Sequence, residues 1–379
     1  MPQRLKVGVL FGGRSAEHEV SLRSAAAVVA ALDRNKYDVI PIKIERDGSW
    51  QLPAASEHAF LEGVAGKERQ STGLLADPTA SRLLVRFGSQ APESQPGWGT
   101  RPELGRLDVV FPVLHGPYGE DGTVQGFLEM TGIPYVGAGV VASAVAMDKA
   151  LMKALFRERG LPVLPCRVVL RHEWEGSEGQ VVSDVEEALT YPVFVKPANM
   201  GSSVGVTKVD TREDLAPALK EAFRYDRKAL VEQGVDAREI EVSVLGNDEP
   251  QASLPGEIVP AGDFYDYQAK YVDDSELLIP APLDARTTQR AQELAVEAFR
   301  AVDASGMGRV DLFLLRSNES LMVNEINTIP GFTSISMYPK LWEASGLRMS
   351  KLVDRLIELA LERARKKASQ ATSYTPPPS

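Results

Sequence analysis

Short apolar runs and helical patterns alternate in the amino-terminal part of the chain. Apolar runs occupy residues 6–10, 39–44 and 107–113, and residues 17–32 carry apolar side chains at helical spacing. Such runs are typical of strands, and spacings of three and four residues are typical of a helix. Strands that alternate with helices predict a parallel sheet. Residues 46–105 have no sustained period and are rich in Pro, Gly and Ser, so we expect an insertion of loops and short elements.

The middle of the chain predicts a second, smaller sheet. Residues 142–159 have the spacing of one continuous helix. Strands are expected at 192–196 and 206–209, on either side of a loop rich in glycine and serine, and again at 229–232. The mixture of helix and strand predicts a small α+β unit.

The carboxyl-terminal part predicts a larger antiparallel sheet covered by helices. We expect strands at 240–245 and 251–260 and helices at 287–304 and 351–367. Residues 262–280 are aromatic and charged without a clean period, which favours a lid that becomes ordered over a ligand. The Thr-, Pro- and Ser-rich end after Ala368 is expected to be a disordered tail.

Residues 308–336 contain a predicted hairpin with polar side chains on one face. Two runs with a period of two join through a polar turn, and a hairpin centred on Asn318 places Asp311 opposite Glu325 and Arg309 opposite Asn327. Opposed carboxylates repel each other, and carboxylate and amide oxygens are the ligands that Mg²⁺ prefers. The pattern favours a metal site, and a solvated polar face is the alternative.

Composition limits the class of protein. The chain has 379 residues, of which 44% are hydrophobic and 25% charged, a balance typical of a globular protein with two or three domains. No apolar run has membrane-spanning length and no secretory signal is recognisable. The single cysteine, Cys166, excludes an internal disulfide and fits a reducing cytoplasm. The net charge of −10 argues against nonspecific nucleic-acid binding.

Three glycine-rich turns are candidate ligand sites. The turn at 12–15 opens a helix, where backbone N–H groups attract phosphate or carboxylate, but it lacks the full dinucleotide-binding pattern. His115 begins a glycine-rich turn at the carboxyl end of a strand, so it lines a site or has a purely structural role. The loop at 201–205 follows Lys196 and predicts either phosphate binding or only a tight hairpin.

An ordered series of motifs resembles the D-alanine–D-alanine ligases, which are ATP-grasp enzymes. The motifs read GGRSAEHEVS from Gly12, HGPYGEDGTVQG from His115, MDK from Met147, VKPANMGSSVGV from Val195, FYDYQAKY from Phe264, and GRVD with NEINTIPGFTSIS in the hairpin. The resemblance covers almost the whole chain except the 46–105 insertion and the tail. Gln233 departs from the pattern, since a lysine often stands at that position.

The resemblance implies a fold of α/β and α+β class, the ATP-grasp fold, in three domains. These are an amino-terminal Rossmann-like parallel-sheet domain at 1–139, a small central α+β subdomain at 140–230, and a larger carboxyl-terminal subdomain with an antiparallel sheet at 231–367. Residues 368–379 are the expected disordered tail. The resemblance also implies a homodimer. The single cysteine, the net charge and the lack of a long apolar run favour a cytoplasmic protein that binds neither membrane nor nucleic acid.

The resemblance assigns roles by position. It implies that Glu17, supported by His115, holds the ammonium group of the first D-alanine, and that Tyr271 of the lid orders the site through Ser202. Arg309, Gly331 and Ser336 would surround the substrate carboxylates and the reacting carbonyl. Asp311, Glu325 and Asn327 match the ligands of two Mg²⁺ ions, which Mn²⁺ can replace. The positions assigned to ATP are Lys149, Lys196, Gly201, Ser202, Ser203, Val204, Glu232, Val235, Glu239 and Lys270.

The implied activity is ATP-dependent ligation of two D-alanines through a D-alanyl phosphate, for peptidoglycan precursor synthesis. A related ligase that takes D-lactate or D-serine as the second substrate shares most motifs, and Lys270 with Tyr271 favours the dipeptide. A nucleotide-binding regulator without turnover is a third hypothesis. The intact set of Arg309, Asp311, Glu325 and Asn327 argues against it.

Overall fold

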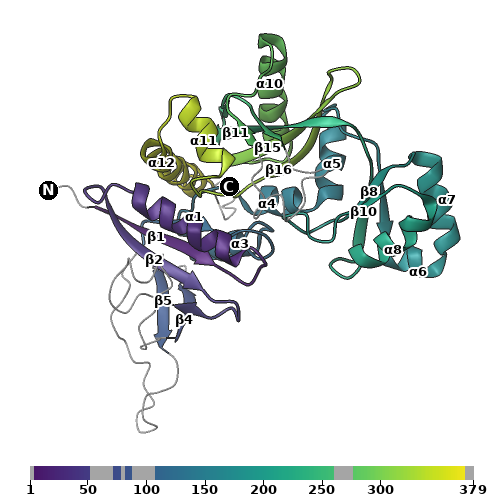
Figure 1. The fold of residues 1–379 in the computed structure, drawn as a ribbon. Helices are drawn as coiled ribbons and strands as arrows, with labels where there is room; N and C mark the ends of the chain where they lie inside the picture. Colours follow the sequence, from purple (N-terminus) through teal and green to yellow (C-terminus); the bar gives the residue numbers. More distant parts are fainter. Residues whose placement is uncertain (1–3, 52–70, 78–81, 88–106, 260–275, 372–379) are drawn as a thin grey trace, which may run out of the picture.

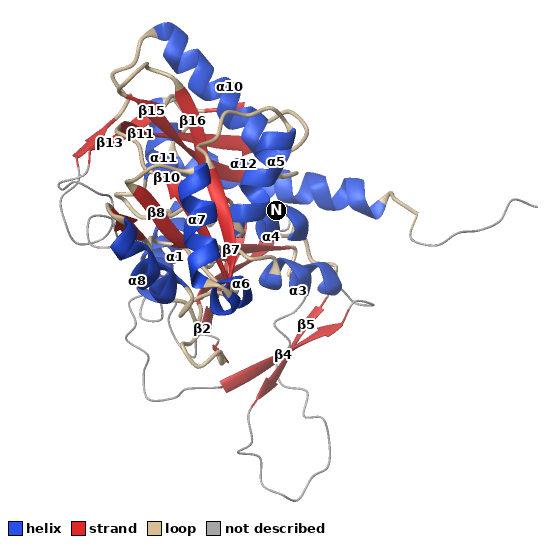
Figure 2. Ribbon diagram, turned by 90° about the vertical axis from the view of Figure 1, so that its right-hand side faces the viewer, coloured by secondary structure: helices blue, strands red, loops and turns tan. Residues whose placement is uncertain are grey.

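The computed structural model describes residues 4–51, 71–77, 82–87, 107–259 and 276–371. These residues form three sheets, and helices cover each of them (Figures 1 and 2). In Figure 1 the amino-terminal domain lies at the lower left, the central sheet at the right and the carboxyl-terminal sheet at the top. Within the part of the chain that is described, no helix combines the length and apolar character that crossing a bilayer requires.

The amino-terminal sheet has the parallel core that the sequence predicts. Strands β1 (Leu5–Gly12), β2 (Tyr37–Ile44) and β6 (Val109–Val113) pair in parallel, with β1 in the middle. Helix α1 (His18–Ala31) follows β1 and packs against it, and α3 (Thr123–Thr131) follows β6. This order brings the turns after β1 and β6 to the same edge of the sheet, as expected for parallel strands that share a direction.

The insertion extends this sheet. Strands β3 (Trp50–Gln51), β4 (Ser71–Asp77) and β5 (Arg82–Phe87) pair antiparallel, so the described order is β5-β4-β3-β2-β1-β6. The prediction of short elements within 46–105 is therefore confirmed for these strands, and the rest of that segment lies outside the described residues.

The central sheet has its own hydrophobic core. Its described strands are β7 (Cys166–Leu170), β10 (Lys228–Gln233), β8 (Val193–Pro197) and β9 (Thr207–Val209), in that order and all antiparallel. Helices α6 (Arg171–Gly176), α7 (Glu178–Ala188) and α8 (Arg212–Ala222) supply the other side of the core. The core is thus assembled from residues close in sequence.

The single helix predicted at 142–159 is wrong, because the structure has two helices there. Helix α4 (Val140–Met147) and helix α5 (Lys149–Glu158) are separated by Asp148, whose backbone is extended with φ −86° and ψ 97°. The Asp148 carboxylate accepts hydrogen bonds from the Ala150 and Leu151 N–H groups and so caps α5. Both helices share a hydrophobic core with the carboxyl-terminal sheet. The domain boundaries remain predictions.

The carboxyl-terminal sheet is antiparallel, as predicted. Its described strands are β14 (Glu276–Leu278), β13 (Gly256–Val259), β11 (Ala237–Gly246), β15 (Gly306–Leu315) and β16 (Leu321–Asn327), in that order, with β12 (Gln251–Ala252) paired to β11. Helix α10 (Ala285–Ala301) packs on this sheet, and α11 (Met337–Ala344) and α12 (Met349–Ala368) follow it.

Helix α12 also completes the amino-terminal core. Leu352 and Leu356 belong to one buried cluster with Val7 of β1 and Val28 of α1. At the rim of this contact the Asp354 carboxylate accepts hydrogen bonds from the Lys36 ammonium and the Tyr37 hydroxyl. Segments more than 300 residues apart in sequence therefore share one core.

Candidate active site

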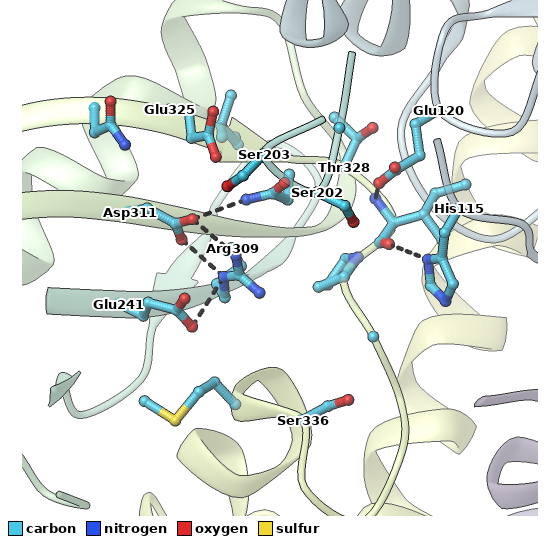
Figure 3. Close-up of a pocket in the computed structure, with 18 of the residues that line it drawn as sticks. His115, Glu120, Ser202, Ser203, Glu241, Arg309, Asp311, Glu325, Thr328 and Ser336 are labelled. Carbon is cyan, nitrogen blue, oxygen red and sulfur yellow. Dashed lines mark hydrogen bonds and ion pairs between the residues drawn. The ribbon is translucent and has the colours of Figure 1, made fainter. Parts of the chain in front are cut away.

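A pocket of about 250 Å³ opens where the three sheets meet. The amino-terminal turns, the glycine- and serine-rich loop of the central sheet and one face of the β15–β16 hairpin all contribute to its walls (Figure 3). Of the residues that the sequence assigns to a site, the pocket is lined by Glu17, His115, Lys149, Lys196, Gly201, Ser202, Ser203, Glu239, Arg309, Asp311, Glu325, Asn327, Gly331 and Ser336.

Five predicted site residues do not appear in this lining. Val204, Glu232 and Val235 are described but are not among the residues that line the pocket. Glu232 lies directly behind Lys196, and Val235 follows β10 with about a third of its surface exposed. Lys270 and Tyr271 lie outside the described residues, so their predicted place on a lid stays a prediction.

The predicted register of the hairpin is confirmed at its functional end. Arg309 pairs with Asn327 and Asp311 with Glu325. Beyond this point the register shifts by one, because Leu312 pairs with Val323 and leaves Asn324 as an extra residue in β16. Such a bulge bends one strand and frees part of its backbone for other partners. The sequence pattern predicts the hairpin but not the bulge.

Arg309 is held between two carboxylates. Its Nε lies 2.7 Å from Asp311 Oδ1 and 3.0 Å from Glu241 Oε2, and its Nη2 donates to Asp311 Oδ2 at 2.7 Å (Figure 3). Two parallel bonds to one carboxylate fix the plane of a guanidinium. Glu241 comes from β11, next to β15, and the sequence analysis missed it because nothing in the local pattern marks this strand position.

The hairpin face carries the donors that a hard cation requires. The Asp311 and Glu325 carboxylates are opposite each other, and the Asn327 amide donates to Asp311 Oδ2 at 3.0 Å. No cluster of three or more His, Cys, Asp or Glu suited to a metal occurs within the described ranges. The oxygen set of two carboxylates and one amide nevertheless fits Mg²⁺, which keeps several waters and takes few protein ligands.

Glu17 joins the amino-terminal domain to the central loop. Its carboxylate accepts a hydrogen bond from the Ser202 hydroxyl. Ser202 and Ser203 both have positive φ, 51° and 57°, a backbone conformation that costs energy for residues other than glycine. Gly116 has φ 71°, and a Cβ there would lie 2.5 Å from the Glu17 carboxylate, so only glycine fits beside it. The Ser202 loop and the turn at Gly116 therefore both contact the Glu17 carboxylate closely.

His115 connects the amino-terminal domain to the loop that follows the hairpin. Its Nδ1 lies 3.0 Å from the Ile329 carbonyl and its Nε2 lies 3.2 Å from the Ser24 hydroxyl, which also accepts from the Phe332 N–H. Burial lowers the pKa of His115, although Glu17 opposes this effect. The neutral ring then donates from Nδ1 and accepts at Nε2. His115 thus positions the 329–332 segment with both ring nitrogens engaged.

The loop that follows β16 carries both Gly331 and Ser336. A Cβ at Gly331 would lie 2.7 Å from the Ser336 hydroxyl oxygen, so the backbone can approach Ser336 only because residue 331 is glycine. The Ser336 Oγ in turn accepts from the Thr333 N–H at 3.0 Å. The result is a compact loop from which Gly331, Thr333 and Ser336 line the pocket.

Two lysines bring positive charge to the pocket. Lys149 Nζ donates to the Met200 carbonyl at 2.7 Å and lies 3.7 Å from Glu325. Lys196 Nζ donates to Glu232 at 2.5 Å. Burial acts to lower the pKa of Lys196, but the attraction of Glu232 outweighs it and the pKa is raised. Lys196 is therefore cationic at neutral pH.

Glu120 is a buried carboxyl group that the sequence analysis did not assign, although it belongs to the motif beginning at His115. It accepts from the Gly116 N–H at 2.7 Å and from the Ile329 N–H at 3.2 Å. Burial and the negative charge of Glu17 raise the pKa of Glu120 to about 8, against the effect of these two bonds. The folded protein therefore keeps Glu120 protonated at neutral pH.

Glu120→Gln is expected to change how thermal stability depends on pH. Because its pKa is raised in the folded state, Glu120 contributes stability that is complete below about pH 4.5 and is lost as the pH rises through about 8. Between pH 5 and pH 9 the melting temperature of the wild-type protein should therefore fall more than that of Glu120→Gln. The prediction concerns this difference in slope, and a constant difference between the two melting temperatures does not affect it. Glu343→Gln, on an exposed face of α11, is the control. Parallel melting profiles for wild type and Glu120→Gln would refute a raised pKa.

Comparison with known proteins identifies the family. The amino-terminal family model, "D-ala D-ala ligase N-terminus", matches residues 6–138, and "D-ala D-ala ligase C-terminus" matches residues 155–358. The chain is 53% identical to the D-alanine–D-alanine ligase of Heliobacterium modesticaldum, covering 98% of each chain. It is 47% identical to that of Natranaerobius thermophilus, covering 98% of this chain and 99% of the relative.

Solved structures agree in fold. The D-alanine–D-alanine ligase from Coxiella burnetii matches with a TM-score of 0.80 at 38% identity, covering 96% of each chain. The VanG D-Ala:D-Ser ligase from Enterococcus faecalis matches with a TM-score of 0.82 at 37% identity, covering 94% of this chain and 100% of that one. With both family models matched and relatives of about half identical sequence along almost its whole length, the chain belongs to the D-alanine–D-alanine ligase family of ATP-grasp enzymes.

Proposed function

We propose that this protein is an ATP-dependent carboxylate–amine ligase that joins two D-alanines into D-alanyl-D-alanine. The observation that carries the proposal is the meeting of three chemistries in one pocket. The lining includes a carboxylate suited to an ammonium group (Glu17), two lysines suited to phosphates, and a guanidinium beside opposed carboxylates. The product serves peptidoglycan precursor synthesis, which follows from the function of the family.

The first D-alanine binds by its charges. Its ammonium group pairs with Glu17, whose carboxylate is oriented by the Ser202 hydroxyl and which lies on the wall supported by His115. Tyr271 of the lid completes this set through Ser202. Binding in this pose leaves the carboxylate of D-alanine directed toward the polar face of the hairpin, where phosphoryl transfer takes place.

Phosphoryl transfer brings two anions together, so the site must supply positive charge. Membership in the family implies the use of ATP and of a divalent metal. Lys149, Lys196 and Lys270 contact the phosphates, and the 201–204 loop closes over them with its backbone N–H groups. Asp311, Glu325 and Asn327 would hold two Mg²⁺ ions, or Mn²⁺ in their place. When bound, these ions neutralise charge on the transferring phosphoryl group.

The reaction has two steps, and the second forms the peptide bond. The carboxylate of the first D-alanine attacks the γ-phosphate of ATP, ADP leaves, and D-alanyl phosphate results. The amine of the second D-alanine then attacks this carbonyl and phosphate leaves. Donors must stabilise the oxyanion that develops, a role suited to Arg309 and the Gly331 N–H, with Ser336 beside the second carboxylate. The lid excludes water that would hydrolyse the acylphosphate.

The remaining assignments belong to the same proposal. Glu232 and Val235 border adenine, and Glu239 takes the ribose hydroxyls. The domains divide at residues 139 and 230, with a tail after 367, and the enzyme acts as a homodimer. We also assign it to the cytoplasm, which its single cysteine, Cys166, favours.

A ligase that accepts D-serine is the second candidate, because a solved D-Ala:D-Ser ligase matches the chain with a TM-score of 0.82. The lid, where such enzymes differ, falls outside the described residues, so the distinction rests on Lys270 and Tyr271 in the sequence. D-lactate is the acceptor to be tested beside D-serine.

The test is a direct assay of the purified protein. Incubation with ATP, Mg²⁺ and D-alanine is expected to release one phosphate for each dipeptide formed, with little mixed product when D-serine or D-lactate is added. Mixed product in excess of dipeptide would reassign the second substrate. Nucleotide binding with neither phosphate release nor dipeptide would favour a regulator without turnover.

A further inference from the structure

A buried cluster of three charges lies behind the phosphate-facing wall of the pocket. The carboxylate of Glu232, on β10, lies between two ammonium groups, with Lys153 Nζ 2.5 Å from Oε1 and Lys196 Nζ 2.5 Å from Oε2. Glu232 and Lys153 side chains are each only 2% exposed, whereas Lys196 is 13% exposed and lines the pocket. The cluster carries one positive charge in excess, and only its Lys196 end faces the ligand site.

Lys153 is fixed from several sides. Helix α5 carries it between the two sheets, where its ammonium group pairs with Glu232 and also donates to the Asn324 carbonyl at 3.0 Å. Asn324 is the extra residue of the β16 bulge, directly before Glu325. The bulge thus presents a carbonyl that a regular hairpin would use in its ladder. Lys153 therefore links the central sheet to the hairpin while making no contact with the pocket itself.

The two lysines cannot have the same role when nucleotide binds. Lys196 donates to one oxygen of Glu232 and also lines the pocket, so its hold on that oxygen weakens when it turns to a phosphate, whereas Lys153 is not among the residues that line the pocket. A buried carboxylate that loses its counter-ion is strongly disfavoured. Burial alone raises the pKa of Glu232, but the attraction of Lys153 and then of Lys196 lowers it to about 2. With Lys153 in place, Glu232 still has one cation after Lys196 has moved.

We infer that Lys153 is a positioning residue for the nucleotide, which keeps the Glu232 carboxylate charged and oriented toward the base while Lys196 transfers from Glu232 to the phosphates. This inference rests on the proposed function, in which Glu232 borders adenine. A fixed carboxylate accepts a hydrogen bond from the exocyclic amine of adenine and repels the carbonyl oxygen that guanine has in that place. Lys153 would accordingly set both nucleotide affinity and the preference for ATP over GTP.

The experiment measures nucleotide binding by calorimetry, so that it does not depend on dipeptide formation. Lys153→Met is expected to weaken Mg²⁺-ATP binding about tenfold or more and GTP binding much less, which reduces the ATP preference. Lys153→Arg, which keeps the charge, is expected to restore most of the affinity. In catalysis, Lys153→Met should raise KM for ATP while KM for D-alanine changes less than about twofold.

A double-mutant cycle separates positioning from a merely structural role. Because Lys153 acts through Glu232, Lys153→Met is expected to add less than about threefold to the loss already caused by Glu232→Gln. The double variant removes both of the charges that are only 2% exposed and leaves Lys196, which faces the pocket, so it is the variant to measure if Lys153→Met alone does not fold. Lys220→Met, at an exposed lysine of α8, is the matched control and should bind ATP as wild type does.

The inference is overturned if Lys153→Met binds ATP normally, if it weakens ATP and GTP equally, or if its effect is fully additive with that of Glu232→Gln. The proposed function is refuted by a different result: the wild-type protein binds ATP but forms no dipeptide in the assay.

Discussion

Arg309→Ala is expected to lower kcat for dipeptide formation by about a hundredfold to a thousandfold, or to abolish it. In the proposed mechanism Arg309 is the side-chain donor that stabilises the developing oxyanion, and loss of one such donor typically raises the barrier by about 3 kcal/mol. The truncation also removes the cation from between Glu241 and Asp311, whose carboxylates it now separates. Steady-state kinetics should therefore be measured together with the melting temperature, which is expected to fall without loss of the folded state.

The control for this prediction is Arg316→Ala. Arg316 is 57% exposed and pairs with Asp236, which is also exposed, so its truncation is expected to leave kcat within about twofold of wild type. A near wild-type rate for Arg309→Ala would contradict the assignment of Arg309 to the reacting centre.

Glu325→Ala is expected to reduce turnover to background at ordinary magnesium concentrations. Glu325 is opposite Asp311, and a cation between the two loses one of its two carboxylate ligands in the variant. Lys149, 3.7 Å from Glu325, also loses a negative neighbour. The measurement is dipeptide formation as a function of Mg²⁺ and Mn²⁺ concentration, combined with Mn²⁺ binding by electron paramagnetic resonance in the presence of ATP. We expect weaker Mn²⁺ binding and a higher metal requirement for any residual rate.

Glu358→Ala is the matched control for the metal prediction. It removes an exposed carboxylate of α12 that pairs with Arg355 on the same helix and does not line the pocket. Its metal dependence should equal that of wild type. If Glu325→Ala kept both the wild-type rate and the wild-type metal dependence, the hairpin face would not be the metal site.

The hairpin could be predicted from the sequence because its information is local. Apolar and polar residues alternate along both strands, and the polar turn marks where they join, so the two strands and their polar face follow from spacing. The pairing of Asp311 with Glu325 also needs the bulge, because the register nearer the turn, with Leu312 opposite Val323, would otherwise place Asn324 opposite Asp311. The one-residue shift at Asn324 could not be predicted in this way. It depends on Lys153 and on the Pro162 carbonyl, which bonds to the Val323 N–H, and both come from a distant segment.

The residues that the sequence analysis missed share this property. Glu241 meets Arg309 only because β11 lies beside β15. Lys153 meets Glu232 only because α5, which packs on β16, brings it next to β10. The break between α4 and α5 had a local signal in Asp148, a good helix cap, but apolar spacing on both sides hid it. Motif resemblance supplied most of the site, since it carries information about distant contacts that spacing does not.

The way the cores are assembled has a consequence for biosynthesis. The central core draws on residues between 169 and 231, so it can condense on the ribosome soon after that stretch emerges. The amino-terminal sheet is different, because Leu352 and Leu356 of α12 cover strands made some 300 residues earlier. At a synthesis rate of roughly 5–20 residues per second, that apolar sheet waits tens of seconds for its cover. During synthesis, the amino-terminal domain is therefore the part of this enzyme whose exposed apolar surface most needs a chaperone.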